Sequence, residues 1–393
     1  MYQLLKPLQT IAIILLYVFQ SNAQNTIEFH EQRIKELIDS SGIVGVGAAV
    51  IVDKEMVWSG GYGYADKENK IPFTASTIMN IASITKTFTG ACIMKAVEEG
   101  KVSLDVDINT YLPFKVINPY FPNEKITLRH LATQTSGLAD RYPFYTDSMY
   151  YFEGKQPEPL SEFLKNYFLP DGKYYSKDNF LDSKPGTKRD YSNIGAGLAG
   201  YIVELGTGKK LNDYARQHIF KPLKMLHTGW SLAEINKNDH TKLYTKTENS
   251  IEVIQLYEIT TYPDGGVRTS INDLSKFFIS LLNDGKYKGA RILKKKIVAE
   301  MLKFQFDESN KPENVNLDEL NSGIFWATKM NATRIGHNGS DPGVRTFMLS
   351  DLSKEIGIIL FFNTSMSGKD ELKFFDIYKE FYKYAMVLKK QNN

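Results

Sequence analysis

The feature that most constrains this chain is an apolar segment, Phe88 to Val97, that follows a solitary lysine. Lys86 is the only charged residue between positions 71 and 94. A helix built from this segment is apolar on nearly every side, which is typical of a helix threaded through a core. A lysine in such a helix is costly unless charges or hydrogen bonds hold it, or unless its pKa falls. The sequence therefore predicts a core helix that starts near Ser83, carries Lys86 and stops at Gly100.

Ser83 suggests a chemical role for this lysine. A spacing of three residues places both side chains on one helix face. Near a helix start, the hydroxyl also meets free backbone N–H groups and the positive end of the helix dipole. Serine alone is a poor nucleophile, and a desolvated lysine within reach is one way to activate it. A Ser-x-x-Lys tetrad also arises by chance, so the hypothesis depends on the motifs described below.

Composition and charge describe a globular chain with ample material for a core. The 393 residues carry a formal net charge of +3, which is too small to indicate a nucleic-acid partner. The only cysteine, Cys92, lies in the predicted core helix, so no intrachain disulfide is expected. His30-Glu31 is followed by Ile34 where a metallohydrolase would need its second ligand. We therefore expect no metal and no other cofactor.

The N-terminus has the layout of a secretory signal peptide. Lys6 precedes an apolar run, Ile11 to Phe19, and the small residues Ser21-Asn22-Ala23 follow it. This run is too short to span a bilayer comfortably. We expect residues 1–23 to be removed and the protein to be periplasmic or secreted, with membrane attachment only if this segment stays uncleaved.

Strand patterns lie at both ends of the chain and helical patterns lie between them. Strands are predicted over residues 45–52, 56–64, 323–329, 333–337, 344–349 and 356–362. Helices are predicted over 29–38, 83–100, 128–135, 193–205, 211–220, 274–282, 292–304 and 371–388. These patterns favour a mixed α/β fold in which both termini build one antiparallel sheet flanked by helices, beside a largely helical lobe. We expect one catalytic domain, 24–393, with a sheet lobe (about 24–75 and 322–393) and a helical lobe (about 76–321).

Residues 139–187 are the least regular part of the chain and are rich in tyrosine and phenylalanine. One helix is predicted inside this excursion, over residues 160–168. The aromatic residues could form a pocket wall or a satellite core, and the sequence leaves both interpretations open.

Two further motifs carry groups that suit the same chemistry. Tyr191-Ser192-Asn193 offers a phenol that can move a proton and an amide that can donate and accept at once. Gly336-His337-Asn338-Gly339-Ser340 lies on a predicted strand. The strand edge could pair with a peptide-like substrate, the Ser340 N–H could form half of an oxyanion hole, and His337 could donate to a substrate carboxylate.

Together these motifs resemble the three signatures of class C β-lactamases and the related D-Ala-D-Ala carboxypeptidases and esterases. The matching residues are Ser83-Ile84-Thr85-Lys86, Tyr191-Ser192-Asn193 and His337-Asn338-Gly339. The resemblance implies that Ser83 is acylated and that Lys86 and Tyr191 share the general-base and general-acid work. It also implies that Asn193, His337, Gly339 and Ser340 bind the substrate, a small molecule or a peptide.

Several departures from the family pattern bear on the substrate. The third motif begins with His337, whereas β-lactamases of this class have a permanently charged lysine there. Gln134 stands where the family often has histidine, and Asp264 stands where it has a small residue. We therefore expect a secreted serine hydrolase that forms an acyl-enzyme on a peptide, amide or ester, most of all a D-amino-acid peptidase or carboxypeptidase. The alternatives are an esterase, a class C-like β-lactamase, and a non-catalytic relative that binds or senses a ligand.

Overall fold

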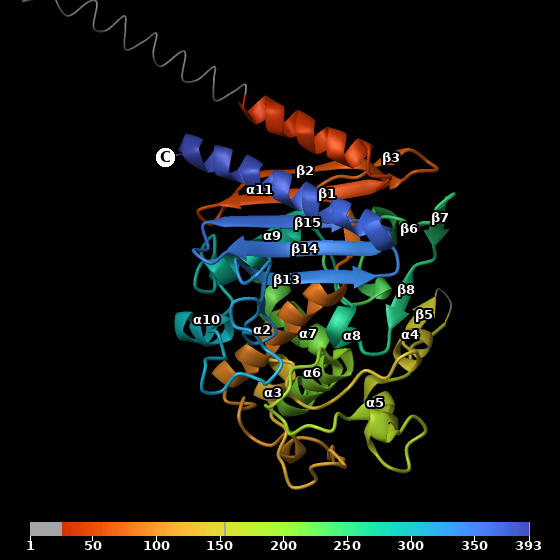
Figure 1. The fold of residues 1–393 in the computed structure, drawn as a ribbon, viewed down its shortest axis with the longest axis vertical. Helices are drawn as coiled ribbons and strands as arrows, with labels where there is room; N and C mark the ends of the chain where they lie inside the picture. The colour runs from red at the N-terminus through yellow and green to blue at the C-terminus, as the bar shows by residue number, and fades with distance from the viewer. Residues whose placement is uncertain (1–25, 153–154, 393) are drawn as a thin grey trace, which may run out of the picture.

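A computed structural model describes residues 26–152 and 155–392. Its largest feature is a seven-stranded antiparallel sheet with the order β12-β13-β14-β15-β1-β2-β3 (Figure 1). The strands are β1 (Gly45–Val52), β2 (Glu55–Asp66), β3 (Ile71–Pro72), β12 (Ala327–Lys329), β13 (Arg334–Asp341), β14 (Val344–Asp351) and β15 (Ile356–Phe362). In the middle of the sheet, β1 pairs with β15, so that Val46 lies opposite Phe362. The two ends of the chain therefore build one sheet, as the sequence predicts.

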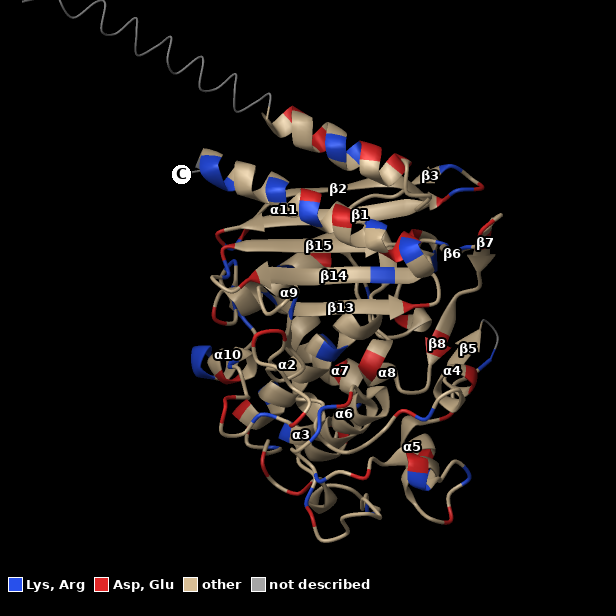
Figure 2. Ribbon diagram, viewed as in Figure 1, with Lys and Arg blue, Asp and Glu red and all other residues tan. Residues whose placement is uncertain are grey.

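Two helices from the chain ends cover one face of this sheet (Figure 1). They span residues 26–39 and α11 (Leu372–Asn392). On α11, Phe374, Ile377 and Phe381 are buried and pack with Val46 and Ile358 of the sheet. Lysines and acidic residues alternate along the outer sides of both helices (Figure 2). Each helix is therefore amphipathic, with its apolar stripe on the sheet.

The opposite face of the sheet carries the helical part of the molecule (Figure 1). Its central helix, α2 (Thr85–Glu98), is preceded by a 3₁₀ turn, Ala82–Ile84. Phe88 of α2 stacks on Phe277 of α9 (Ile271–Leu282), with ring centroids 3.8 Å apart. The helices around α2 include α3 (Leu128–Ala132), α6 (Asn193–Thr207), α7 (Leu211–Ala215), α8 (Tyr262–Gly265) and α10 (Lys295–Leu302). The predicted core helix is confirmed, and its burial explains why it is apolar all round.

Residues 139–187 contain more regular structure than the sequence indicates. The predicted helix is α5 (Leu160–Phe168), and α4 (Phe144–Ser148) and β5 (Tyr150–Phe152) precede it. Short strand pairs elsewhere were also not foreseen: β4 (Ile78–Asn80) with β9 (Arg268–Ser270), β5 with β8 (Tyr257–Ile259), β6 (Leu243–Lys246) with β7 (Ile251–Ile254) and β16 (Thr364–Ser365), and β10 (Lys286–Tyr287) with β11 (Ala290–Arg291). A strand of two to four residues is too short to show a period-two pattern, so tertiary pairing decides it.

Several predicted boundaries are wrong: the strand predicted over 333–337 extends to Asp341, and the helix predicted over 292–304 is shortened to Lys295–Leu302. The helix predicted over 128–135 ends at Ala132, because Gln134 adopts a left-handed φ of 65°. The strand predicted over 323–329 is reduced to its last three residues, β12. None of the described helices is long and apolar enough to cross a membrane. The predicted signal peptide, residues 1–23, lies outside the described residues and stays a prediction.

Candidate active site

Ser83 lies in the 3₁₀ turn between β4 and α2, where the backbone is strained. Ala82, the residue before it, is buried and has a φ of 47°, a left-handed conformation that residues with a Cβ atom seldom adopt. Strand β13 packs against this turn: a Cβ atom on Gly339 would lie 2.5 Å from the carbonyl oxygen of Ile81. The hydroxyl of Thr346 on β14 donates to the same oxygen at 3.0 Å. Strain held in this way by the surrounding structure is common at reactive sites.

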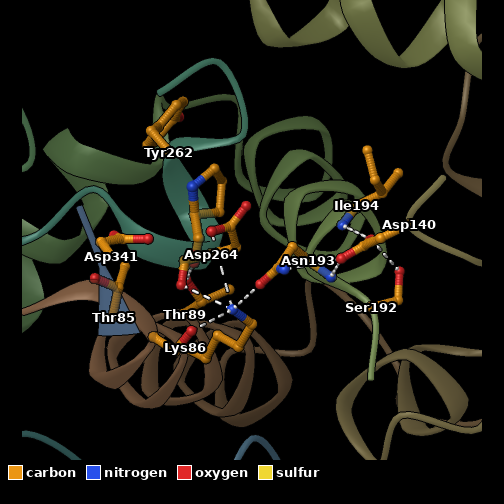
Figure 3. Close-up of polar contacts among 12 residues, drawn as sticks. Thr85, Lys86, Thr89, Asp140, Ser192, Asn193, Ile194, Tyr262, Asp264 and Asp341 are labelled. Carbon is orange, nitrogen blue, oxygen red and sulfur yellow. Dashed lines mark hydrogen bonds and ion pairs between the residues drawn. The ribbon is translucent and has the colours of Figure 1, made fainter. Parts of the chain in front are cut away.

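Lys86 is fully buried one turn along α2, and its ammonium group has three hydrogen-bond acceptors. It donates to Asn193 Oδ1 at 2.6 Å and to the carbonyl oxygen of Asp264 at 3.0 Å (Figure 3). It also donates to Ser83 Oγ at 3.2 Å. A lysine ammonium has three N–H donors, so this geometry uses all of them. The structure therefore satisfies the buried charge with acceptors from three separate parts of the chain.

The charges around Lys86 keep it protonated. Burial alone would lower the pKa of Lys86, but attraction to Tyr191 and to Asp264 outweighs burial, so the pKa lies above its ordinary value. The nearer carboxylate oxygen, Oδ1 of Asp264, lies 3.9 Å from the ammonium nitrogen. Burial raises the pKa of Asp264 to about 6 despite this attraction. Near neutral pH the pair is therefore an ammonium beside a carboxylate.

Asp140 holds the amide of Asn193 in place at the start of α6. Its carboxylate accepts hydrogen bonds from the backbone N–H groups of Asn193 and Ile194 at 2.9 and 3.0 Å. It also accepts from Asn193 Nδ2 at 2.8 Å and from the Ser192 hydroxyl at 3.1 Å (Figure 3). An ionised carboxylate can only accept hydrogen bonds, so Asp140 faces the NH2 group of the Asn193 side chain. The oxygen of the same amide is therefore turned toward Lys86. Asp140 is thus a positioning residue behind the second motif.

Tyr191 and His337 lie on the open side of Lys86. The Tyr191 ring centroid is 4.9 Å from the ammonium nitrogen and 6.3 Å from the centroid of the His337 ring. Tyr191 is 37 % exposed, so a substrate can reach it. Three motifs that are distant in the sequence thus converge on Ser83, Lys86 and Tyr191.

His337 is in a state that opposes the hydrogen bond expected from it. Its Nδ1 lies 2.6 Å from the carbonyl oxygen of Asn338, and a carbonyl can only accept, so Nδ1 carries the proton. Burial, together with the positive charges of Lys329 and Lys86, holds the pKa of His337 well below its usual range. A neutral ring protonated on Nδ1 has only an acceptor at Nε2. Without a substrate, His337 therefore presents an acceptor at Nε2, and its expected hydrogen bond to a substrate carboxylate stays a prediction.

The last two expected substrate-binding residues lie on β13 beyond the part that pairs with β12. Pairing with β12 ends at Gly336, whereas pairing with β14 continues through Gly339 and Ser340. Gly339 lies against the Ser83 turn, as described above, and Ser340 is exposed. This arrangement leaves one edge of the strand beside the Ser83 turn, and the role of the Ser340 N–H stays a prediction.

The aromatic excursion contributes to both the core and the site. Phe163, Tyr167 and Phe180 belong to the main hydrophobic core. Tyr145, in contrast, donates its hydroxyl proton to Asp264 Oδ2 at 3.1 Å. Tyr150 donates to Asp341 Oδ1 at 2.8 Å, directly after the β13 residues at the site. The aromatic residues of this segment therefore form part of the main core rather than a satellite core, and a pocket wall stays a prediction.

The sequence did not predict Asp140 as a site residue, nor that Asp264 lies beside the Lys86 ammonium. Asp264 was visible as a departure from the family pattern, although nothing local placed it beside Lys86. Asp140 follows the short segment Ser136–Ala139 with no helical or strand periodicity, so no sequence signal connected it with Asn193.

Residues 30–376 match the family model described as Beta-lactamase. The chain belongs to this family of serine hydrolases. A curated relative, Protein flp of Staphylococcus aureus (strain N315), is 26 % identical over 343 residues, which cover 85 % of this chain and 63 % of the relative. The chain therefore spans somewhat less than two thirds of the length of that protein.

Solved structures share the fold of this β-lactamase-family chain. The D-amino acid amidase from Ochrobactrum anthropi SV3, in complex with L-phenylalanine, superposes with a TM-score of 0.72 at 23 % identity, covering 93 % of this chain and 99 % of the amidase. The D-alanine carboxypeptidase AmpC from Burkholderia cenocepacia superposes with a TM-score of 0.69 at 20 % identity, with coverages of 93 % and 99 %. At these identities the likeness establishes the mixed α/β architecture.

Proposed function

We propose that this protein is a secreted serine hydrolase that forms an acyl-enzyme on Ser83 and acts on a D-amino-acid peptide or amide. The observation that carries the proposal is that all three N–H groups of the Lys86 ammonium donate hydrogen bonds, one of them to Ser83 Oγ at 3.2 Å. The names of the two structural relatives, a D-amino acid amidase and a D-alanine carboxypeptidase, support the substrate class.

The hydrogen bonds of Lys86 also favour one assignment of the base. An ammonium with three acceptors has no lone pair for the Ser83 proton, and its raised pKa keeps it in that state. Tyr191 is the remaining acid–base group beside the lysine. We therefore assign proton removal from Ser83 to the Tyr191 oxygen in its phenolate form, stabilised by the charge of Lys86. The phenol so formed then gives this proton to the leaving group and becomes the phenolate again.

Hydrolysis of an uncharged ester is the second candidate, because the neutral His337 supplies no cation for a substrate carboxylate. The strained Ala82 and the complete hydrogen-bonding of Lys86 support catalysis over the role of a non-catalytic ligand-binding relative.

Covalent labelling tests the nucleophile directly. A fluorophosphonate probe or a fluorescent penicillin should label the wild-type protein and the Ser367→Ala control, in which an exposed serine is removed. Labelling should vanish in Ser83→Ala, and labelling that survives there would refute Ser83 as the nucleophile. Intact-mass measurements after incubation with D-amino-acid amides, D-Ala-D-Ala peptides and simple esters would identify the acyl group retained. Turnover of esters alone would favour the second candidate.

A further inference from the structure

A second carboxylate lies beside the pair formed by Lys86 and Asp264. Asp341 ends β13, directly after Ser340, and its side chain is largely buried. It lies next to α8 (Figure 3): a Cβ atom on Gly265, the neighbour of Asp264, would be 3.5 Å from Asp341 Oδ2. Two carboxylates from different elements therefore lie close together in the site.

The three aspartates of the site differ in how well their charges are compensated. Asp140 accepts four hydrogen bonds, and Asp264 lies 3.9 Å from the Lys86 ammonium nitrogen. Asp341 accepts from the Tyr150 hydroxyl at 2.8 Å, and it forms no ion pair with any residue that the structure describes. One ammonium group cannot neutralise several carboxylates, so the least compensated of them keeps a proton most readily. That carboxylate is Asp341.

The groups around Asp341 agree with this order. Burial raises the pKa of Asp341 to about 7, and the negative charge of Asp264 adds to this effect, against the attraction of Lys86 and Arg268. The titratable and charged groups that face it are Asp264 of α8, Lys86 of α2, Arg268 of β9, Tyr145 of α4, Tyr150 of β5 and Tyr257 of β8. The three tyrosines stay neutral, because burial raises the pKa of each well above its usual range. Asp341 is therefore the acid of this group that still titrates at neutral pH.

The end of β13 is also the point where three parts of the site are joined. Asp341 is bonded to Tyr150 of the aromatic excursion, as described above. The carbonyl oxygen of the next residue, Pro342, accepts from the Tyr257 hydroxyl at 2.9 Å. That hydroxyl in turn accepts from Asn80 Nδ2 at 3.0 Å, and Asn80 is the last residue of β4 before the turn that carries the nucleophile. The state of Asp341 therefore bears on the excursion, the strand edge and the nucleophile turn at once.

We propose that Asp341 is a positioning residue that works in its neutral form: it fastens the end of β13 to Tyr150 without placing a second negative charge next to Asp264. The inference rests on the proposed function, in which the Tyr191 oxygen acts as a phenolate and negative charge develops on the carbonyl oxygen of the substrate. Another carboxylate charge close by opposes both. The nucleophilic serine should therefore react more slowly once Asp341 ionises.

The rate at which a fluorophosphonate labels Ser83, followed against pH, tests this inference. Asp341→Asn keeps an oxygen that can accept from Tyr150, but it does not ionise. At about pH 6 it should be labelled about as fast as the wild-type protein. At about pH 8 it should be labelled up to about tenfold faster, because only about a tenth of the wild-type molecules still carry the proton. Tyr150→Phe should move the decline of the wild-type rate to higher pH, since it removes a hydrogen bond that lowers the pKa of Asp341.

Asp147→Asn is the matched control, because it removes an exposed acid of α4 from the same segment. Its labelling should follow the wild-type pH profile. A ratio of Asp341→Asn to wild-type rates that stays constant with pH, or an equal change in Asp147→Asn, would overturn the inference and leave Ser83 as the nucleophile. Absence of Ser83 labelling at every pH would instead refute the proposed function.

The proton on Asp341 can also be measured without catalysis. Burial raises the pKa of Asp341 in the folded protein, so stability is lost as the pH rises from the unfolded to the folded pKa. Urea unfolding of Ser83→Ala and of the double variant with Asp341→Asn should therefore show Ser83→Ala losing stability relative to the double variant between about pH 4 and about pH 8. A relative gain over this range would mean that Asp341 is an ordinary ionised carboxylate, which would overturn the inference whatever the labelling.

Discussion

Asp264→Asn should lose less stability than the wild-type protein as the pH rises, although it removes a carboxylate that lies 3.9 Å from an ammonium group. Asp264 is 3 % exposed and accepts a hydrogen bond from the Tyr145 hydroxyl at 3.1 Å. Burial raises its pKa from 3.8 to about 6, even though Lys86 attracts the ionised form. The folded protein therefore binds this proton more tightly than the unfolded chain does.

The sign of the pH dependence follows from that difference. Between the unfolded pKa and the folded pKa, the native state holds more protons, so stability falls as pH rises through this window. A shift from 3.8 to about 6 is worth roughly 3 kcal/mol at about 1.4 kcal/mol per pKa unit. Asparagine resembles the protonated side chain and does not titrate, so the variant escapes this loss. Between about pH 4 and about pH 8, the stability of Asp264→Asn relative to wild type should rise by roughly 2 to 3 kcal/mol.

Urea unfolding of both proteins at a series of pH values measures this difference. Asp370→Asn is the matched control, because its two lysine partners lower the pKa of that exposed carboxyl to about 2. Its contribution is complete above the unfolded pKa and is lost only at lower pH, so the control should show no trend over the same range. A wild-type protein that gains stability over Asp264→Asn as pH rises would refute the reasoning, since Asp264 would then behave as an ordinary salt-bridged carboxylate.

Two further substitutions test how the site is held together. Asp140→Ala should lower the free energy of unfolding by about 3 kcal/mol, because it strands buried N–H donors at the start of α6. It should also lower kcat for any Ser83-dependent substrate. A variant that unfolds at a lower temperature but keeps the wild-type kcat would contradict the positioning role of Asp140. Gly339→Ala would place a Cβ atom 2.5 Å from the Ile81 carbonyl oxygen, so β13 must move away from the Ser83 turn. Its fluorophosphonate labelling should be much slower than wild type, and a wild-type rate would show that the two segments separate without consequence.

The elements that the sequence predicts well are those with long, uninterrupted patterns. Strands predicted over 45–52 and 356–362 coincide with β1 and β15, which pair in the sheet centre and are buried on both faces. The helix predicted over 160–168 coincides with α5, whose apolar residues recur at helical spacing. In each case local pattern and tertiary packing agree. The short strands and the end of α3 depend on partners far along the chain, so local pattern could not find them.

The residues of the candidate site also fall into those that local sequence patterns predict and those that they do not. Its reacting groups lie in compact motifs, and the structure brings Ser83, Lys86 and Asn193 into one hydrogen-bonded cluster. The charges that set their states come from elsewhere: Asp264 from α8 and Asp140 from the loop after α3. Neither aspartate lies at a helix or strand spacing from a motif, so a local sequence pattern could not connect it with the site.

There is a physical reason why the reacting groups lie in short motifs whereas the charged residues around them do not. A nucleophile and the group that hydrogen-bonds it must touch, so a helix turn can encode Ser83 and Lys86 three residues apart. An electrostatic partner acts over several ångströms through a medium of low dielectric, and the fold can supply it from any element. Lys329 ends the short edge strand β12 and Arg189 precedes the second motif, yet both raise the positive potential at His337 and help to keep it neutral. The charge state of the histidine that stands in place of the motif's usual lysine is therefore set by elements outside the motif.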